Sequence, residues 1–162
     1  RYPGTVPSDV VLPGLVESTD LPHTILEIAG IDEAERGASL PGSPGRSFLH
    51  YACDGGEEFR SDVYSEYGLC DDTSGMRMVR EGAWKYTRTG GGDDLLFDLE
   101  ADPAETENLA TIPEYAERLR RMQERLIDRM ARMPRPPIQG RRFVPEAHAG
   151  PRAGARHGGG QP

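Results

Sequence analysis

The chain has 162 residues, of which 36% are hydrophobic and 28% charged, and its formal net charge is −8. This length suffices for one domain with a modest core, and the composition is typical of a globular protein. Residues 134–162 hold five arginines and one glutamate, so the rest of the chain is strongly acidic. The acidic body excludes nucleic acid as the main partner, because phosphate contacts require clustered Lys and Arg.

The sequence does not identify the cellular compartment of the protein. No run approaches the roughly 20 apolar residues of a membrane span, so we expect no membrane partner. The sequence opens on Arg1 rather than Met, which is typical of the interior of a longer chain, so a targeting signal could lie upstream. Cytoplasmic, periplasmic and secreted locations therefore all stay open.

The two cysteines give no sign of a disulfide framework or a metal site. Cys53 and Cys70 lie neither in a C-x-x-C motif nor in a zinc-binding spacing. We expect free thiols, with a disulfide between the two as the open alternative.

The first 58 residues predict one short helix between two irregular stretches. Pro and Gly interrupt residues 1–19, which favours extended or looping chain. Asp20 as N-cap and Gly30 as C-cap predict a helix over residues 21–29. Its apolar residues have helical spacing: Leu21, Ile25 and Ile28. Residues 32–58 are rich in Gly, Pro, Ser and acids, and we expect mostly loop there.

The middle of the chain predicts a small antiparallel sheet. Residues 60–68 alternate well enough for a strand, and residues 76–87 form two period-2 runs on either side of Gly82, as a tight hairpin requires. A Gly-rich turn at residues 90–94 leads to a further strand over residues 95–99. Consecutive strands with short connections favour a meander of three or four strands.

A long C-terminal helix is predicted after the last strand. The pair Asp102-Pro103 is typical of a helix start, and residues 111–114 fit a capping box. One face of the helix is apolar and should pack on the sheet: Tyr115, Leu119, Met122, Leu126, Met130 and Met133. The opposite face is charged: Arg118, Arg121, Glu124 and Arg125. Prolines end the helix, and we expect residues 134–162 to be a disordered Pro/Gly/Arg-rich tail.

Three segments carry recognisable motifs. Residues 20–31 are similar to the motif Asp-Leu-x-Pro-Thr-Leu-Leu-x-Leu-Ala-Gly-Ile, although His23 replaces the proline. Residues 78–86 are similar to a hairpin with Val-Arg before the turn and aromatic-Lys-Tyr after it. Residues 96–110 are similar to the closing motifs Leu-Tyr-Asp-Leu, Asp-Pro-x-Glu and Asn-Leu-Ala. In this order, the segments resemble the C-terminal part of type I sulfatases, which belong to the alkaline-phosphatase superfamily.

The resemblance implies an α/β fold for the whole protein. The part of it present in this chain would be α+β. Residues 1–31 would end the large sulfatase domain, and residues 32–59 would be a connecting loop. Residues 60–133 would form the small C-terminal unit, a sheet of about four strands packed by the long helix. Residues 134–162 would be the tail.

The resemblance also implies hydrolysis of sulfate esters through a formylglycine nucleophile and a divalent metal, calcium in this family. Neither cysteine has the Cys/Ser-x-Pro/Ala-x-Arg context that formylglycine requires. The acidic pairs Asp71-Asp72 and Asp93-Asp94 lie beside glycines and are read as turns. We therefore expect no catalytic residue, metal ligand or cofactor in this chain, and no activity from it alone. The implied partners are a missing N-terminal catalytic domain and a small sulfated substrate.

Three residues are candidates for the rim of the substrate cleft. Glu66 lies on the predicted strand 60–68, and a solvated strand face is the alternative explanation for it. His50 lies in the preceding loop, where packing beside neighbouring aromatic residues would explain it equally. Lys85, the only lysine in the chain, could bind a sulfate or stack on an aromatic ring. An exposed position on an alternating strand would explain it equally.

Two other functions stay open. The chain could be a stand-alone, non-catalytic binding or interaction module, or it could be part of a phosphonate monoester or phosphodiester hydrolase with the same scaffold. A fragment should expose an apolar face where a larger domain packs, and should be poorly stable alone, whereas an independent module should have a closed, polar surface.

Overall fold

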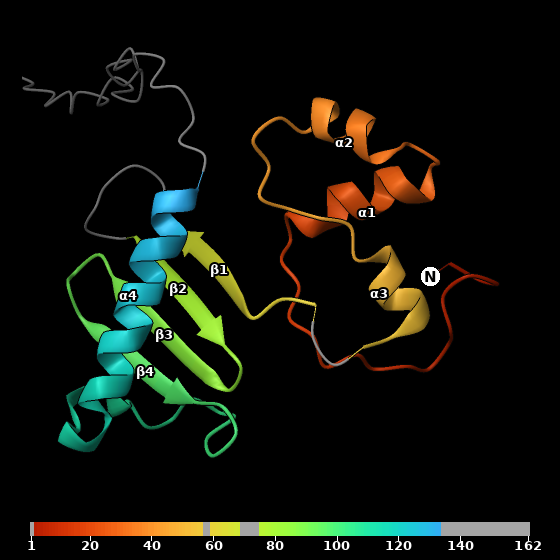
Figure 1. Cartoon of the computed structure of the whole chain (residues 1–162). Helices are drawn as coiled ribbons and strands as arrows, with labels where there is room; N and C mark the ends of the chain where they lie inside the picture. The colour runs from red at the N-terminus through yellow and green to blue at the C-terminus, as the bar shows by residue number, and fades with distance from the viewer. Residues whose placement is uncertain (1, 57–58, 69–74, 134–162) are drawn as a thin grey trace, which may run out of the picture.

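The computed structural model describes residues 2–56, 59–68 and 75–133, which form a helical part and a sheet-and-helix part (Figure 1). The sheet-and-helix part is an antiparallel sheet with a long helix across one face. This confirms the predicted α+β arrangement. The domain boundaries inferred above stay a prediction, and the predicted tail lies outside the described residues. In the described ranges, no helix is long and apolar enough to cross a membrane.

The N-terminal part contains three short helices: α1 (Asp20–Ile28), α2 (Glu33–Ser39) and α3 (Leu49–Asp54). Helix α1 confirms the predicted helix over residues 21–29. The prediction of mostly loop for residues 32–58 is wrong, because α2 and α3 both lie there. Helix α2 forms because the Asp32 carboxylate accepts a hydrogen bond from the Glu35 amide at 2.9 Å and caps the helix.

The start of α1 differs from the prediction, whereas its end agrees with it. Thr19, not Asp20, holds the N-cap position, and it makes no side-chain cap bond. Asp20 is the first helical residue, and its fully buried carboxylate bonds groups outside the helix. Gly30 has a φ of +83°, the left-handed conformation that favours glycine after a helix end.

The sheet has four strands in sequential antiparallel order: β1 (Asp62–Tyr67), β2 (Met76–Glu81), β3 (Trp84–Thr89) and β4 (Asp94–Asp98). The predicted meander is therefore confirmed. Glu81 pairs with Trp84 across the tight hairpin between β2 and β3, and Gly82 in its turn has a φ of +57°. A residue with a side chain would be strained there, which explains why the sequence carries glycine.

Helix α4 (Ala116–Arg132) crosses the sheet, but it begins later than predicted. Two 3₁₀ turns, η1 (Leu109–Thr111) and η2 (Pro113–Tyr115), precede it. The predicted capping box is wrong, because Thr111 ends η1 and Tyr115 holds the α4 N-cap position without a side-chain bond. The predicted helix start at Asp102 is also wrong. Its carboxylate instead accepts hydrogen bonds from the amides of Thr106 at 2.7 Å and Glu107 at 2.9 Å, which closes a loop.

The free edge of β4 is completed by one side chain. The Asn108 amide oxygen accepts hydrogen bonds from the Leu96 and Ala110 amides at 3.0 Å, and its amide nitrogen donates to the Asp94 carbonyl at 3.1 Å. Leu109, the next residue, is buried. This agrees with the structural role expected for Asn108 and covers a sheet edge that would otherwise present unpaired backbone groups.

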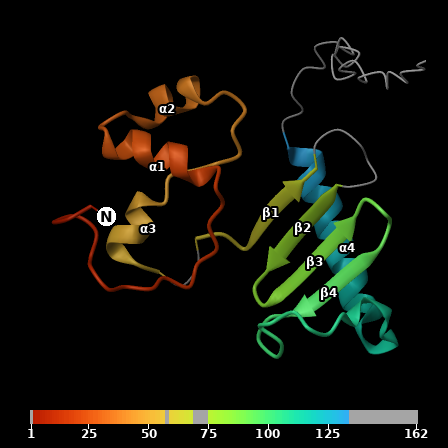
Figure 2. The ribbon, with the colours of Figure 1, turned by 180° about the vertical axis from the view of Figure 1, so that it is seen from behind.

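The hydrophobic core lies between the sheet and α4, and Figure 2 shows the opposite face of the sheet with α4 behind it. Buried side chains from the four strands, η1 and α4 fill it: Tyr64, Val79, Tyr86, Leu96, Leu109, Met122 and Leu126. The apolar face predicted for α4 is thus confirmed at its centre. Met130, near the helix end, is 36% exposed.

Candidate functional site

Glu66 lies on β1 and is exposed, opposite Arg77 of β2. Its carboxylate accepts a hydrogen bond from the Tyr64 hydroxyl at 2.6 Å. Burial raises the pKa of Tyr64, and this hydrogen bond to Glu66 raises it further, so the phenol stays protonated as the donor. The contact fixes the carboxylate at the sheet edge, and a role at a substrate rim stays a prediction.

His50 lies on α3, not in a loop, and its side chain is 89% exposed. Its Nδ1 atom is 2.8 Å from a carboxylate oxygen of Asp54, one helical turn further along. The alternative that His50 packs beside Phe48 and Tyr51 is therefore wrong. Its proposed role at a substrate rim stays a prediction.

Lys85 lies on β3 and forms an ion pair that joins two of the motifs described above. Its Nζ atom is 2.6 Å from the Glu105 carboxylate, and Glu105 has a φ of +56°, which is unfavourable for a residue with a side chain. The aromatic-Lys-Tyr motif thus contacts the Asp-Pro-x-Glu motif directly. The pair neutralises much of the charge that sulfate binding by Lys85 would use.

The three candidates share no hydrogen bond or ion pair with one another in the described part of the chain. Glu66, His50 and Lys85 lie on three different elements, and each contacts a separate local partner.

A buried ion pair at the start of α1 was missed by sequence reasoning. Asp20 accepts hydrogen bonds from the amides of Glu17 at 2.8 Å and Arg46 at 2.9 Å, and from Arg60 Nε at 2.9 Å. Burial alone would raise the pKa of Asp20, but the hydrogen bonds from Arg60 and the two amides outweigh it and hold that pKa below its usual value. The carboxylate therefore joins α1 to two distant segments.

A second set of charges joins the N-terminal segment to the sheet and α4. The buried Glu17 carboxylate accepts a hydrogen bond from the Tyr64 amide of β1 at 2.8 Å and pairs with Arg129 of α4. Arg129 and Arg125 both approach Asp62, at 3.6 and 3.3 Å. These residues are far apart in sequence, so no local motif announces them.

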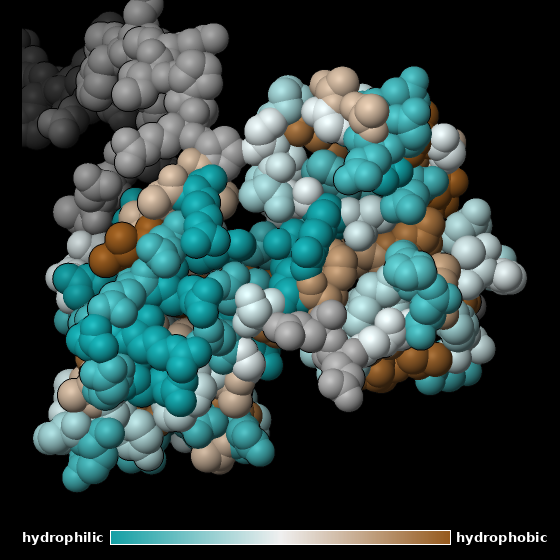
Figure 3. Space-filling model, viewed as in Figure 1, coloured by the Kyte–Doolittle hydropathy of each residue, from teal (hydrophilic) through white to brown (hydrophobic). Residues whose placement is uncertain are grey.

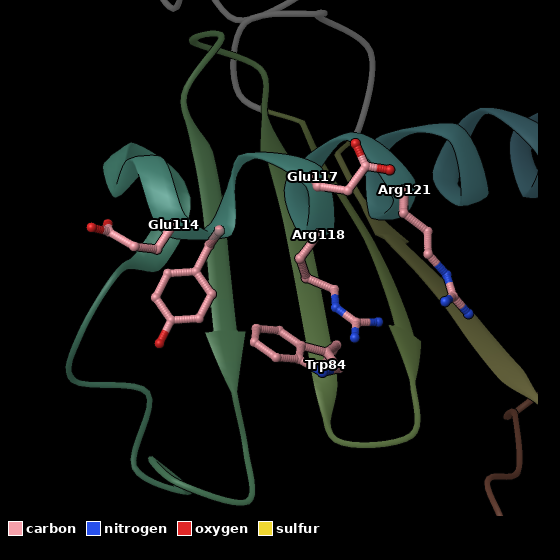
Figure 4. A pocket seen from close by; sticks show the side chains of 6 residues that line it. Trp84, Glu114, Glu117, Arg118 and Arg121 are labelled. Carbon is pink, nitrogen blue, oxygen red and sulfur yellow. The ribbon is translucent and has the colours of Figure 1, made fainter.

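The charged face of α4 also contacts the sheet. Glu81 of β2 pairs with Arg125 and with Arg121, the latter at 2.8 Å. Arg118 lies over the Trp84 ring, with its guanidinium carbon 4.7 Å from the ring centroid. An open cavity of about 400 Å³ is bordered by Trp84, Tyr115, Arg118 and Arg121 (Figure 4).

The described residues do not form a metal centre. Among them, no group of three or more His, Cys, Asp or Glu side chains could hold an ion. Asp94 is engaged by the Tyr86 hydroxyl at 2.6 Å and by Arg88 at 2.7 Å. Cys53 is free, whereas Cys70 and the pair Asp71-Asp72 lie outside the described residues.

Helix α1 presents its apolar side chains to solvent and buries polar ones. Leu21, Ile25 and Ile28 are 49%, 62% and 40% exposed. His23 and Thr24 are buried instead, with His23 Nε2 2.9 Å from the Ser43 hydroxyl and the Thr24 hydroxyl donating to the Asp20 carbonyl at 2.8 Å. Figure 3 shows hydrophobic surface on the part formed by α1, α2 and α3, while the α4 side of the sheet unit is hydrophilic.

Residues 1–132 match the family described as N-sulphoglucosamine sulphohydrolase, C-terminal. The chain is 32% identical over 117 residues to a choline-sulfatase from Rhizobium meliloti, covering 70% of this chain and 22% of that protein. It is 35% identical over 112 residues to the multifunctional alkaline phosphatase superfamily protein PehA from Trinickia caryophylli, covering 64% of this chain and 22% of that protein.

The fold is similar to that of a phosphonate monoester hydrolase from Silicibacter pomeroyi. The TM-score is 0.64 at 22% identity, and the match covers 82% of this chain and 28% of that one. The chain spans only 22% of the length of each of the two curated relatives, the choline-sulfatase and PehA.

Proposed function

The chain belongs to the sulfatase family through that family's C-terminal region, and from this premise we propose that it is the C-terminal part of a sulfuric ester hydrolase. In the proposed enzyme, a preceding catalytic domain supplies the nucleophile and the metal site. The 162-residue chain then contributes the small sheet unit and the end of the large domain, and is inactive alone.

The observation that carries this proposal is the reversed polarity of α1. A surface helix normally turns its apolar stripe toward the core. Here Leu21, Ile25 and Ile28 point outward, while the side bearing Asp20 and Thr24 is buried. Such a face is expected where another part of the same protein packs, and burying three such side chains could contribute several kcal/mol, at about 1.5–3 kcal/mol each.

The chemistry of the donor groups supports placing the catalytic centre outside the described residues. The most buried carboxylate, Asp20, already has Arg60 and two amides as partners. A calcium ion needs six to eight oxygen ligands, usually including several carboxylates, and the described residues contain no group of three or more His, Cys, Asp or Glu side chains that could hold an ion. We propose that formylglycine and a divalent metal belong to the preceding domain.

The name of the matched family makes sulfated sugars the substrate class to test first. A second candidate function is phosphonate monoester or phosphodiester hydrolysis, because the phosphonate monoester hydrolase from Silicibacter pomeroyi has a similar fold. The two differ in the atom attacked, sulfur or phosphorus, and that difference lies in the catalytic domain.

An activity assay on the longer protein separates the two. The gene region that includes the sequence upstream of Arg1 would be expressed beside the 162-residue chain, and each product would be assayed with 4-nitrophenyl sulfate and with 4-nitrophenyl phenylphosphonate. We expect the longer protein to hydrolyse the sulfate faster and the short chain to hydrolyse neither. Faster phosphonate hydrolysis would favour the second candidate, and hydrolysis by the short chain alone would refute the proposal.

A matched pair of variants tests the α1 interface itself. Ile25 and Ile127 are 62% and 64% exposed, on α1 and α4 respectively. In the short chain, Ile25→Ser and Ile127→Ser should each change the free energy of unfolding by no more than about 0.5 kcal/mol. In the longer protein, Ile25→Ser should cost about 1–3 kcal/mol because that side chain becomes buried. Equal effects of the two variants in the longer protein would contradict the proposed interface.

A further inference from the structure

A cavity of about 400 Å³ lies in the sheet-and-helix part, between the start of β3 and the start of α4 (Figure 4). Its volume falls in the range of roughly 300–1,000 Å³ that small-molecule sites occupy. Two aromatic and four charged residues line it: Trp84, Glu114, Tyr115, Glu117, Arg118 and Arg121.

Two aromatic rings form the apolar part of the cavity. The ring centroids of Trp84 and Tyr115 are 5.9 Å apart and the ring planes are tilted by 49°. Both residues are half-buried and pack against the core, so their positions are fixed while part of each ring reaches the cavity. Rigid aromatic faces of this kind suit the C–H surface of a sugar ring.

Arg118 supplies a cation without a carboxylate partner. Its guanidinium lies over Trp84 at 4.7 Å from the ring centroid, and no hydrogen bond or ion pair holds it within residues 2–56, 59–68 and 75–133. Stacking on a ring fixes a guanidinium but leaves the N–H donors in its plane free. Those donors can bind an anionic oxygen group such as a sulfate in a bidentate manner.

The carboxylates that border the cavity do not cancel this charge. Glu117 accepts hydrogen bonds from Arg120 Nε at 3.1 Å and from a terminal Arg120 nitrogen at 2.6 Å. Arg121 is bound to Glu81 at 2.8 Å. This leaves Glu114, which is exposed and could accept a hydrogen bond from a sugar hydroxyl.

We propose that this cavity is a binding site for a sulfated saccharide. The sugar ring packs on Tyr115 and on the part of Trp84 that Arg118 leaves uncovered, and its sulfate bonds the Arg118 guanidinium. The choice of a sulfated sugar rests on the proposed function, whereas the aromatic rings and the free arginine are features of this chain itself. In the longer enzyme the site would hold part of an extended substrate.

The test uses the single tryptophan of the chain as the reporter. The 162-residue chain would be titrated with a heparin-derived tetrasaccharide, with its desulfated form, with sodium sulfate and with an oligoglutamate peptide. Trp84 emission would be followed, and calorimetry would measure affinity independently of the fluorescence of each variant. Arg118→Gln removes the proposed sulfate ligand, and Arg132→Gln, an exposed arginine in the last turn of α4 that does not line the cavity, is the matched control.

We expect the sulfated tetrasaccharide to change Trp84 emission saturably and to bind more tightly than the other three probes. Arg118→Gln should weaken this binding roughly tenfold or more, while Arg132→Gln leaves it within a factor of about two. The proposal is overturned if no saturable change occurs, if both variants bind equally, or if sulfate alone or the peptide binds as well as the saccharide. Because binding is measured without hydrolysis, these outcomes are distinct from failure of the proposed enzyme activity.

Discussion

Replacing Asp20 by alanine should remove the contact that joins α1 to the rest of the molecule. The carboxylate is fully buried and accepts bonds from the Glu17 and Arg46 amides and from Arg60. In Asp20→Ala, the Arg60 side chain, which is only 9% exposed, keeps its charge but loses its partner. Both amides lose their acceptor at the same time.

The structure gives an expected size for this loss. Removing one partner of a buried ion pair typically costs about 3–5 kcal/mol, because the remaining charge is uncompensated. A buried amide without an acceptor adds about 1–3 kcal/mol, although water can reach the exposed Arg46 segment and reduce that cost. We therefore expect Asp20→Ala to lower the free energy of unfolding by about 4 kcal/mol, a large part of the roughly 5–15 kcal/mol of a typical domain.

The assay is urea unfolding followed by far-UV circular dichroism, with two comparison variants. The double variant Asp20→Ala/Arg60→Leu leaves neither charge of this pair unpaired and should regain at least half of the loss. Arg120→Ala removes exposed pairs with Glu117 and Glu124, and should cost no more than about 1 kcal/mol. A loss below about 1 kcal/mol for Asp20→Ala, or a double variant as unstable as the single one, would refute the reasoning.

Three further substitutions probe the core and the turns. Burial, together with the hydrogen bond to Asp94, raises the pKa of Tyr86 to about 12, compared with about 10 in an unfolded chain, so stability should fall as the pH rises from about 10 to 12. Tyr86→Phe should reduce this fall in unfolding curves measured across that range. Met122→Ala, at a fully buried position of α4, should cost about 2–5 kcal/mol in the same assay, and a value below 1 would contradict the described core. At Gly45 an added Cβ would overlap the Thr19 carbonyl, so Gly45→Ala should lower the thermal midpoint by several degrees, and an unchanged midpoint would show that this approach is looser than described.

The sheet was predictable because its signals are local. Period-2 alternation on either side of Gly82 defined the hairpin, and the register confirms it through the pair Glu81 and Trp84. The structural role of Asn108 was also predictable, since an Asn just before a buried leucine can satisfy nearby backbone groups.

The errors arose where two local signals competed. The Gly and Ser content of residues 32–58 suggested loop, but the Asp32 cap was enough to start α2. The capping-box pattern at Thr111 was a false signal, because the chain forms two 3₁₀ turns before α4 begins. Asp20 has the residue type of an N-cap, yet burial against Arg60 gives it a different role.

The charged contacts of the candidate sites were not predictable from the sequence alone. Glu17 and Arg129 are separated by 112 positions, so only the folded chain brings them together. Arg118 was assigned to the charged face of a helix, and its stacking on Trp84 depends on how α4 crosses the sheet. One signal was available: the apolar stripe of α1 was predicted from the sequence, and none of the described residues covers it.

The most direct test of the central claim is to sequence the DNA immediately upstream of the Arg1 codon. We expect an in-frame extension that encodes a Cys/Ser-x-Pro/Ala-x-Arg motif and an early Asp-Asp pair, which would place the nucleophile and metal ligands ahead of this chain. A stop codon followed by a ribosome-binding site directly before Arg1 would contradict the claim and leave a free-standing, non-catalytic unit.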